Sequence, residues 1–301
     1  MKNPIGRLNL TERLVDPRSP DRRPRRAAYA LPTLFTAGNL FLGFLATLKA
    51  YEGAMYAAAG HLGFNVHFQA AAVMIGVAVF LDGLDGRIAR MTNTVSDFGR
   101  EMDSLADVIT FGIAPAVLAF AWGIQFVEGE LGGLIREHLR RAGYFATFFY
   151  ALCGAARLAR FNVQTNPIPK NPGRPDRKYF VGLPIPAAAA MLAAVIFAAG
   201  SEPVVWWPFA VAWIVLLLAL ALLMISSWRY RSFKDFNLLR PRSTLSIIVL
   251  GSTIYLIWNY PQPVLFGLAV MYVGSGIVVR FAGVLRRRFR PAHPQPERQV
   301  G

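Results

Sequence analysis

The sequence has very little cysteine, histidine and charge for its length. A single cysteine, Cys153, occurs among 301 residues, so the chain can form no internal disulfide, and this side chain is expected to serve packing. Charged residues make up only 16% of the chain, against 54% hydrophobic residues. These proportions exclude an ordinary soluble enzyme and favour a protein with several membrane spans. The histidines fall in expected loops or in a tail, and we assign no catalytic or metal-binding role to any of the four: His61, His67, His138 and His293.

The hydrophobic residues gather in segments that are long enough for membrane-spanning helices. The predicted spans cover about 30–50, 68–88, 103–124, 143–160, 181–200, 204–226, 244–260 and 262–284. We therefore expect an all-α fold, a polytopic transmembrane helical bundle of about eight spans. The membrane domain is predicted to occupy residues 28–285, between basic cytoplasmic tails at 1–27 and 286–301.

The basic residues are distributed unequally between the two sides of this predicted bundle. With the N-terminus in the cytoplasm, 28 of the 32 Lys and Arg residues fall on the cytoplasmic side, and the other side has only Lys49, Arg136, Arg140 and Arg141. This excess follows the positive-inside rule and predicts a multi-pass protein of the cell (inner) membrane with both termini in the cytoplasm. The basic tails are expected to lie on anionic lipid headgroups, so no nucleic-acid partner is expected.

Four aspartates lie at the cytoplasmic ends of the second and third predicted spans. Asp82 and Asp85 are three residues apart and Asp103 and Asp107 four apart, so each pair shares one face of a helix. Carboxylates within a membrane are costly unless a charge compensates them. Two such faces turned toward each other would form a site for Mg²⁺ or Mn²⁺. A cation or proton transporter is the non-enzyme alternative, but the opposite halves of both spans are apolar and offer no conduction path.

The aspartates belong to a longer pattern, D-x-x-D-G-x-x-A-R-x8-G-x3-D-x3-D, in which every fixed position is filled between residues 82 and 107. This pattern resembles the signature of the CDP-alcohol phosphatidyltransferase family, whose members join a CDP-linked lipid to an alcohol and release CMP. The resemblance implies that Asp82, Asp85, Asp103 and Asp107 bind two Mg²⁺ or Mn²⁺ ions. It also implies that Asp107 is the general base that accepts the proton of the alcohol.

Further positions are predicted to contact the donor lipid, CDP-diacylglycerol. By resemblance, Gly86, Ala89 and Gly99 let the nucleotide lie against the helices. Arg90 is placed to pair with a phosphate. Alternatively, its side chain has no binding role and only reaches from the helix end to the membrane–water interface. The polar Thr36 and Asn39 in the first span either contact CDP or form an interhelical hydrogen bond, and both alternatives remain open.

The acceptor alcohol is indicated by weaker motifs. Four stretches, at 34–44, 156–162, 179–189 and 228–234, resemble the bacterial membrane-type phosphatidylserine synthases within this family. Thr33 and Arg231 depart from the residues expected there, Asn and Pro. The resemblance implies L-serine as the acceptor, phosphatidylserine as the product, and a homodimer in the lipid bilayer.

The carboxylate of serine requires a nearby cation, and four are candidates: Arg157, Arg160, Lys178 and Arg229. The positive-inside bias explains the same residues without any binding role. These cations would also suit the phosphate of glycerol phosphate or inositol phosphate. Those acceptors, and choline, therefore stay open as alternatives that use the same donor.

Overall fold

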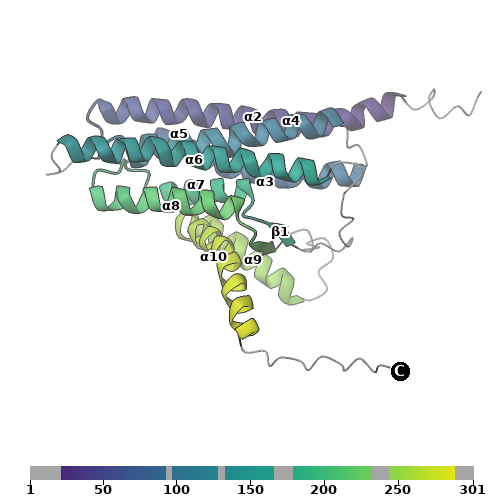
Figure 1. The fold of residues 1–301 in the computed structure, drawn as a ribbon. Helices are drawn as coiled ribbons and strands as arrows, with labels where there is room; N and C mark the ends of the chain where they lie inside the picture. The colour runs from purple at the N-terminus through teal and green to yellow at the C-terminus, as the bar shows by residue number, and fades with distance from the viewer. Residues whose placement is uncertain (1–21, 93–96, 128–132, 166–178, 232–243, 289–301) are drawn as a thin grey trace, which may run out of the picture.

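The computed structural model describes residues 22–92, 97–127, 133–165, 179–231 and 244–288, and helices account for nearly all of them (Figure 1). The helices are α2 (Arg22–Ala58), α3 (Val66–Thr92), α4 (Asp97–Asp107), the π-helix η1 (Val108–Ile113), α5 (Ala114–Gly123), α6 (Gly133–Thr165), α7 (Ile185–Ala198), α8 (Trp207–Ile225), α9 (Thr244–Asn259) and α10 (Pro261–Arg288). The predicted helical class is therefore confirmed. Lys178, one of the proposed acceptor cations, lies outside the described residues.

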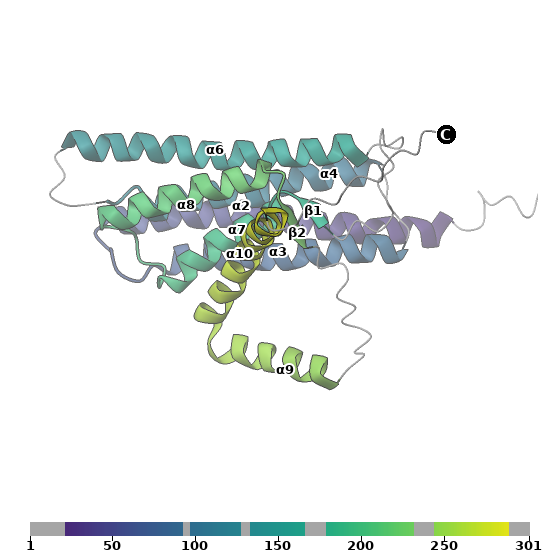
Figure 2. The same ribbon diagram turned by 60° about the horizontal axis from the view of Figure 1, so that its bottom comes forward.

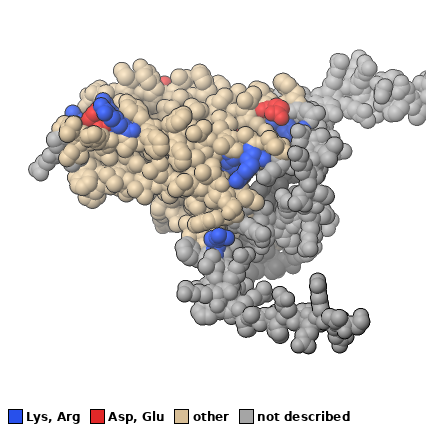
Figure 3. Space-filling view, in the orientation of Figure 1, with Lys and Arg blue, Asp and Glu red and all other residues tan. Residues whose placement is uncertain are grey.

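Five of the described helical segments are long and apolar enough to cross a membrane: Leu34–Ala58, Val66–Leu84, Phe98–Gly123, Trp207–Ile225 and Pro261–Val278. The chain is thus a multi-pass membrane protein, while the count of eight spans stays a prediction. Two shorter apolar helices lie in α7 and α9, which occupy the fifth and seventh predicted spans. On the face seen in Figure 3, most described residues carry no charge and the charged side chains lie in a few small groups, as expected of a protein in lipid.

Two short strands are a departure from the all-α prediction. β1 (Tyr179–Val181) and β2 (Arg229–Arg231) pair antiparallel, with Phe180 opposite Tyr230. Residue 181 was expected to begin a helical span, but Pro184 disfavours helical backbone in the residue before it. The helix instead begins at Ile185, and the extended segment ahead of it pairs with the segment that follows α8.

α2, α3, α6 and α8 run side by side in one bundle, whereas α10 runs across them and α9 projects away (Figures 1 and 2). α2 packs on α3 and α5, α6 packs on α8, and α7 packs on α3 and α10. The turn between α2 and α3 is fixed by the buried Asn65, whose side-chain oxygen accepts hydrogen bonds from the backbone N–H groups of His67 (3.1 Å) and Phe68 (3.3 Å) at the start of α3. Its amide donates to the carbonyl of Gly53 on α2 (2.9 Å).

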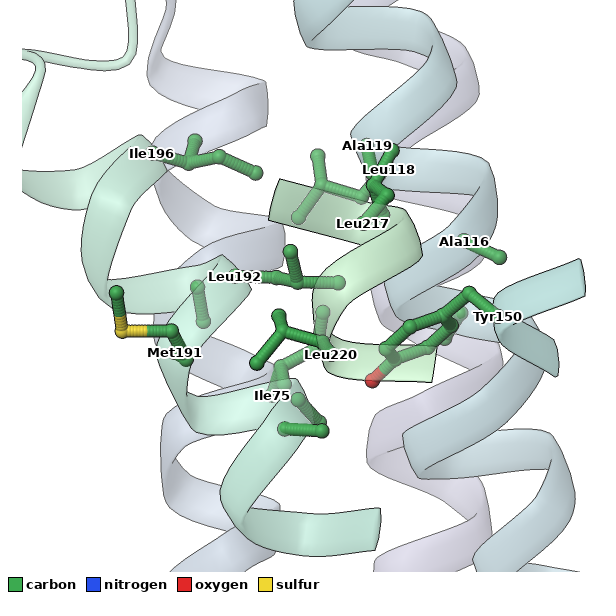
Figure 4. Close-up of a cluster of buried hydrophobic side chains, with 14 of the residues drawn as sticks. Ile75, Ala116, Leu118, Ala119, Tyr150, Met191, Leu192, Ile196, Leu217 and Leu220 are labelled. Carbon is green, nitrogen blue, oxygen red and sulfur yellow. The ribbon is translucent and has the colours of Figure 1, made fainter. Parts of the chain in front are cut away.

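The core lies between α3, α5, α6, α7 and α8 (Figure 4). Ile75, Leu118, Leu192 and Leu220 meet there, and all are almost fully buried. Small residues allow close helix packing in this core, as is usual between membrane helices. The contact of α5 with α8 is made by Trp213, whose indole N–H donates to the carbonyl of Ala119 at 3.0 Å. This packing holds the third membrane segment, which carries two of the aspartates, against its neighbours.

Candidate active site

Three aspartates from two helices come together at one end of the bundle. Asp82 lies on α3, and Asp103 and Asp107 lie on α4. One carboxylate oxygen of each lies within 4.8 Å of the other two, and all three residues are partly buried. Three negative charges this close repel one another, and a bound divalent cation would remove that cost. The group therefore has the ligand type and spacing of a site for a hard cation such as Mg²⁺ or Mn²⁺.

Asp85 follows Asp82 by about one turn of α3, and its backbone is helical. Its side chain, like those of Gly86, Ala89 and Arg90, lies outside the described part of the structure. Gly99 is partly buried on α4, one turn before Asp103. The predicted metal positions and the donor positions from Gly86 to Gly99 therefore lie on the C-terminal part of α3 and on α4, while Thr36 and Asn39 lie on α2.

A π-helix begins directly after Asp107. The segment from α4 through η1 to α5 is continuous, but residues 108–113 are wound more widely than an α-helix. π-turns of this kind are rare and occur often at functional sites. The wider turn is supported from α6, where the buried Tyr150 hydroxyl donates to the Phe111 carbonyl at 3.1 Å. No pattern in the sequence indicates a π-helix at these residues.

The π-helix is also pressed against α2. Thr110 donates a hydrogen bond through its hydroxyl to the carbonyl of Asn39 at 3.1 Å. A Cβ atom added to Gly43 would lie 2.5 Å from the Thr110 hydroxyl oxygen and 2.7 Å from its Cα. Only glycine permits this approach. Thr36 and Asn39 precede Gly43 on the same helix and are 5% and 2% exposed. The backbone contact at Asn39 is thus interhelical, while its buried side-chain oxygen meets no hydrogen-bond partner among the described residues.

The two candidate acceptor arginines on α6 differ in their surroundings. Arg160 donates to the carbonyls of Ile225 (3.2 Å) and Val181 (3.3 Å), so it ties the end of α8 to β1. Arg157 instead interacts electrostatically with Asp107, and also with Tyr272 on α10. Its buried Nε meets no hydrogen-bond partner within the described parts of the chain. Arg229 lies in β2, and its side chain is not among those described.

Three polar residues near the site were not assigned a role from sequence. Asn162 on α6 donates to the Ser104 hydroxyl at 2.9 Å, which ties α6 to the helix that carries Asp103 and Asp107. Tyr230 and Tyr272 lie near each other and, through Tyr272, near Arg157. Burial raises the pKa of Tyr230 to about 12, so its phenol keeps its proton at neutral pH. A polar residue in an apolar segment was the only available signal, and it does not tell which distant residues are neighbours.

An apolar groove of about 400 Å³ lies away from the aspartates, between α2, α5 and α6. Ala50, Ile113, Phe120, Tyr144 and Phe148 are among the residues that line it. It has no cluster of charged side chains, so the chemistry is expected at the aspartates and not in this groove.

Comparison with known proteins agrees with this geometry. Residues 29–225 match the model of the CDP-alcohol phosphatidyltransferase family. The chain is 34% identical over 218 residues to a CDP-diacylglycerol–serine O-phosphatidyltransferase of Helicobacter pylori, which covers 70% of this chain and 76% of the relative. A Bacillus subtilis protein of the same name is 33% identical over 56% of this chain and 75% of its own length. An archaetidylserine synthase of Methanothermobacter thermautotrophicus is 33% identical over 67% and 69%. The chain belongs to the CDP-alcohol phosphatidyltransferase family and is an enzyme of that class.

Proposed function

We propose that the protein transfers the phosphatidyl group of CDP-diacylglycerol to the hydroxyl of L-serine, giving phosphatidylserine and CMP. The observation that carries this proposal is the close group of Asp82, Asp103 and Asp107 oxygens in a chain whose relatives are named for transfer to serine. The archaetidylserine synthase also has serine in its name.

We assign Asp82, Asp85, Asp103 and Asp107 to the binding of two divalent ions, Mg²⁺ or Mn²⁺. The separation of at most 4.8 Å between the three described carboxylates supports this assignment. When bound, such ions neutralise the charge of the pyrophosphate and stabilise the departing CMP. The three described carboxylates come from α3 and α4, two helices packed in the bundle, which supports a site that is formed before substrate arrives.

Asp107 is the general base in this proposal. The serine oxygen forms a bond to the phosphorus that carries diacylglycerol, and the bond from that phosphorus to CMP breaks, with CMP keeping the electron pair. The proton of the serine hydroxyl passes to the Asp107 carboxylate as the new bond forms, because a free hydroxyl has too high a pKa to attack unaided at neutral pH. The place of Asp107 at the junction of α4 and the π-helix supports this role.

The remaining assignments concern substrate binding and topology. The donor lipid is held by the residues of α2, α3 and α4 named above, with Thr36 and Asn39 on the face of α2 that meets the π-helix. The domain at 28–285 crosses the inner membrane with both termini in the cytoplasm, acts on its cytoplasmic side and forms a homodimer. The excess of Lys and Arg on one side supports the orientation.

The test is CMP release by the purified protein from CDP-diacylglycerol with Mg²⁺ or Mn²⁺. L-serine, glycerol phosphate, inositol phosphate and choline are offered separately. We expect release with serine alone. Release with a different acceptor would keep the donor chemistry and overturn the assignment of serine, and release with none of them would overturn the proposed reaction.

A further inference from the structure

The segment of chain beyond the residues matched by the family contributes two tyrosines near the candidate base. The match ends at residue 225, whereas Tyr230 lies on β2 and Tyr272 on α10. Their ring centroids are 6.0 Å apart. Tyr272 interacts electrostatically with Arg157, and Arg157 interacts with Asp107. Residues far apart in sequence are thus linked, through Arg157, to the candidate base.

Two of these residues have buried hydrogen-bond donors for which the described part of the chain offers no acceptor. The Nε of Arg157 and the hydroxyl of Tyr230 are buried and meet no partner within the described residues. Buried polar atoms are rarely left in this state, because each costs about 1–3 kcal/mol. The guanidinium only donates, and a protonated phenol can also donate. The group that would satisfy both is therefore an acceptor, and an anionic oxygen satisfies them best.

Tyr230 is held rigidly in this position. It is fully buried, and its backbone pairs with Phe180 in the β-ladder. Its ring packs directly on Gly276 of α10, where there is no room for a Cβ atom. A hydroxyl fixed in this way loses little rotamer entropy on binding a ligand, which favours selectivity.

We propose that Arg157, Tyr230 and Tyr272 bind the carboxylate of the acceptor and so place its hydroxyl toward Asp107. The inference rests on the proposed function and narrows it, because it assigns Arg157 rather than Arg160 to the acceptor and adds two residues from outside the matched region. Arg160 is already engaged with the carbonyls of Ile225 and Val181. Arg157 supplies the positive charge, and the hydroxyls of the two tyrosines orient the carboxylate by hydrogen bonds.

A carboxylate is recognised here as an oxyanion, so the phosphate of glycerol phosphate shares the required chemistry. The wild-type acceptor profile shows whether the enzyme uses serine or glycerol phosphate. The cluster of Arg157, Tyr230 and Tyr272 can be tested with either acceptor. The donor lipid is assigned to other residues, so its KM provides the comparison. A KM that rises for the acceptor alone separates recognition of the acid group from a general effect on the site.

The test uses Tyr230→Phe and Tyr272→Phe in the full-length protein, each of which removes one oxygen atom and keeps the ring. Initial rates of CMP release are measured while serine, and then CDP-diacylglycerol, is varied. We expect the KM for serine to rise about tenfold in each variant, as the loss of one hydrogen bond to a charged group predicts. The KM for CDP-diacylglycerol should stay at its wild-type value. Tyr255→Phe, at an exposed site on α9, is the matched control.

The outcomes separate this inference from the function on which it rests. Unchanged KM values for serine in both variants, or an equal rise in the KM for CDP-diacylglycerol, would overturn the inference and leave the proposed function intact. A wild-type enzyme that uses glycerol phosphate in place of serine would overturn the proposed acceptor, and a raised KM for glycerol phosphate in the two variants would then support the oxyanion cluster. No turnover with any acceptor would overturn both.

Discussion

Gly43→Ala is expected to disturb the active site through the contact of α2 with the π-helix. The new Cβ would lie 2.7 Å from the Cα of Thr110. Carbon atoms in contact need roughly 3.5 Å, so α2 and the π-helix would have to separate by nearly 1 Å at this point. Overpacking of this kind costs about 1–3 kcal/mol, and the hydrogen bond from Thr110 to the Asn39 carbonyl would be strained as well.

Thr110 lies only three residues after Asp107, so the displacement reaches the candidate base. A misplacement of about 1 Å can lower a catalytic rate by roughly 100-fold. We expect Gly43→Ala to lower kcat roughly 10- to 100-fold, with a lower thermal midpoint in detergent. The assay is serine-dependent CMP release, measured beside a thermal unfolding curve.

Gly38→Ala on the same helix is the matched control, because its added Cβ would meet no atom within 4 Å. This variant should keep the wild-type rate and midpoint. If Gly43→Ala also behaved like the wild-type protein, the close approach of α2 to the π-helix would have no part in positioning Asp107, and the reasoning would be refuted.

Three further predictions follow from the site. Asp107→Asn should lower kcat by a factor of about 10²–10⁴, while equilibrium binding of CDP-diacylglycerol persists. Glu101→Gln on the same helix is the control, and full turnover in Asp107→Asn would show that Asp107 is not the base. Chelation of divalent ions should abolish CMP release, and Asp82→Ala should raise the Mn²⁺ concentration needed for half-maximal activity; activity that survives complete chelation would contradict a metal site. Arg160→Gln should lower stability to unfolding by about 1 kcal/mol and leave the KM for serine unchanged, because its hydrogen bonds go to backbone carbonyls; a serine-specific KM effect would contradict this assignment.

The sequence predicted those parts of the site that depend on spacing within one helix. Asp103 and Asp107 are four residues apart, which places them on one helical face whatever surrounds them. The apolar segments likewise predicted where most helices lie, because a membrane span requires a long run without charge. The meeting of Asp82 with these two residues was expected because carboxylates in a membrane need a compensating charge, and the family resemblance supported it; spacing alone does not say which helices face each other.

Features that depend on contacts between distant segments were not predicted. The π-helix after Asp107 is stabilised by hydrogen bonds of Tyr150 and Thr110 that join it to α6 and α2. No local pattern indicates these bonds. The start of α6 at Gly133, ten residues before the predicted span, is a local feature instead: Glu137 pairs with Arg140 (2.6 Å) and Arg141 (3.1 Å) along the helix, which favours helix in this charged stretch. The roles of Arg157 and Arg160, equivalent in sequence, became distinct only through their neighbours.

The electrostatics of the site and its placement in the bilayer are linked. Carboxylates at the end of a membrane helix are tolerated when a cation compensates them, and the bundle supplies Arg157, which interacts electrostatically with Asp107. A lipid substrate reaches such a site from the bilayer, whereas serine reaches it from water. A position at the end of the bundle, rather than at its centre, suits both substrates.

The most direct test of the central claim is incorporation of labelled L-serine into lipid by the purified protein, with CDP-diacylglycerol and Mn²⁺ or Mg²⁺. The account predicts labelled phosphatidylserine and an equal amount of CMP, with both products lost on chelation. Absence of label from the lipid, while CMP is released with a different alcohol or without any metal, would contradict it.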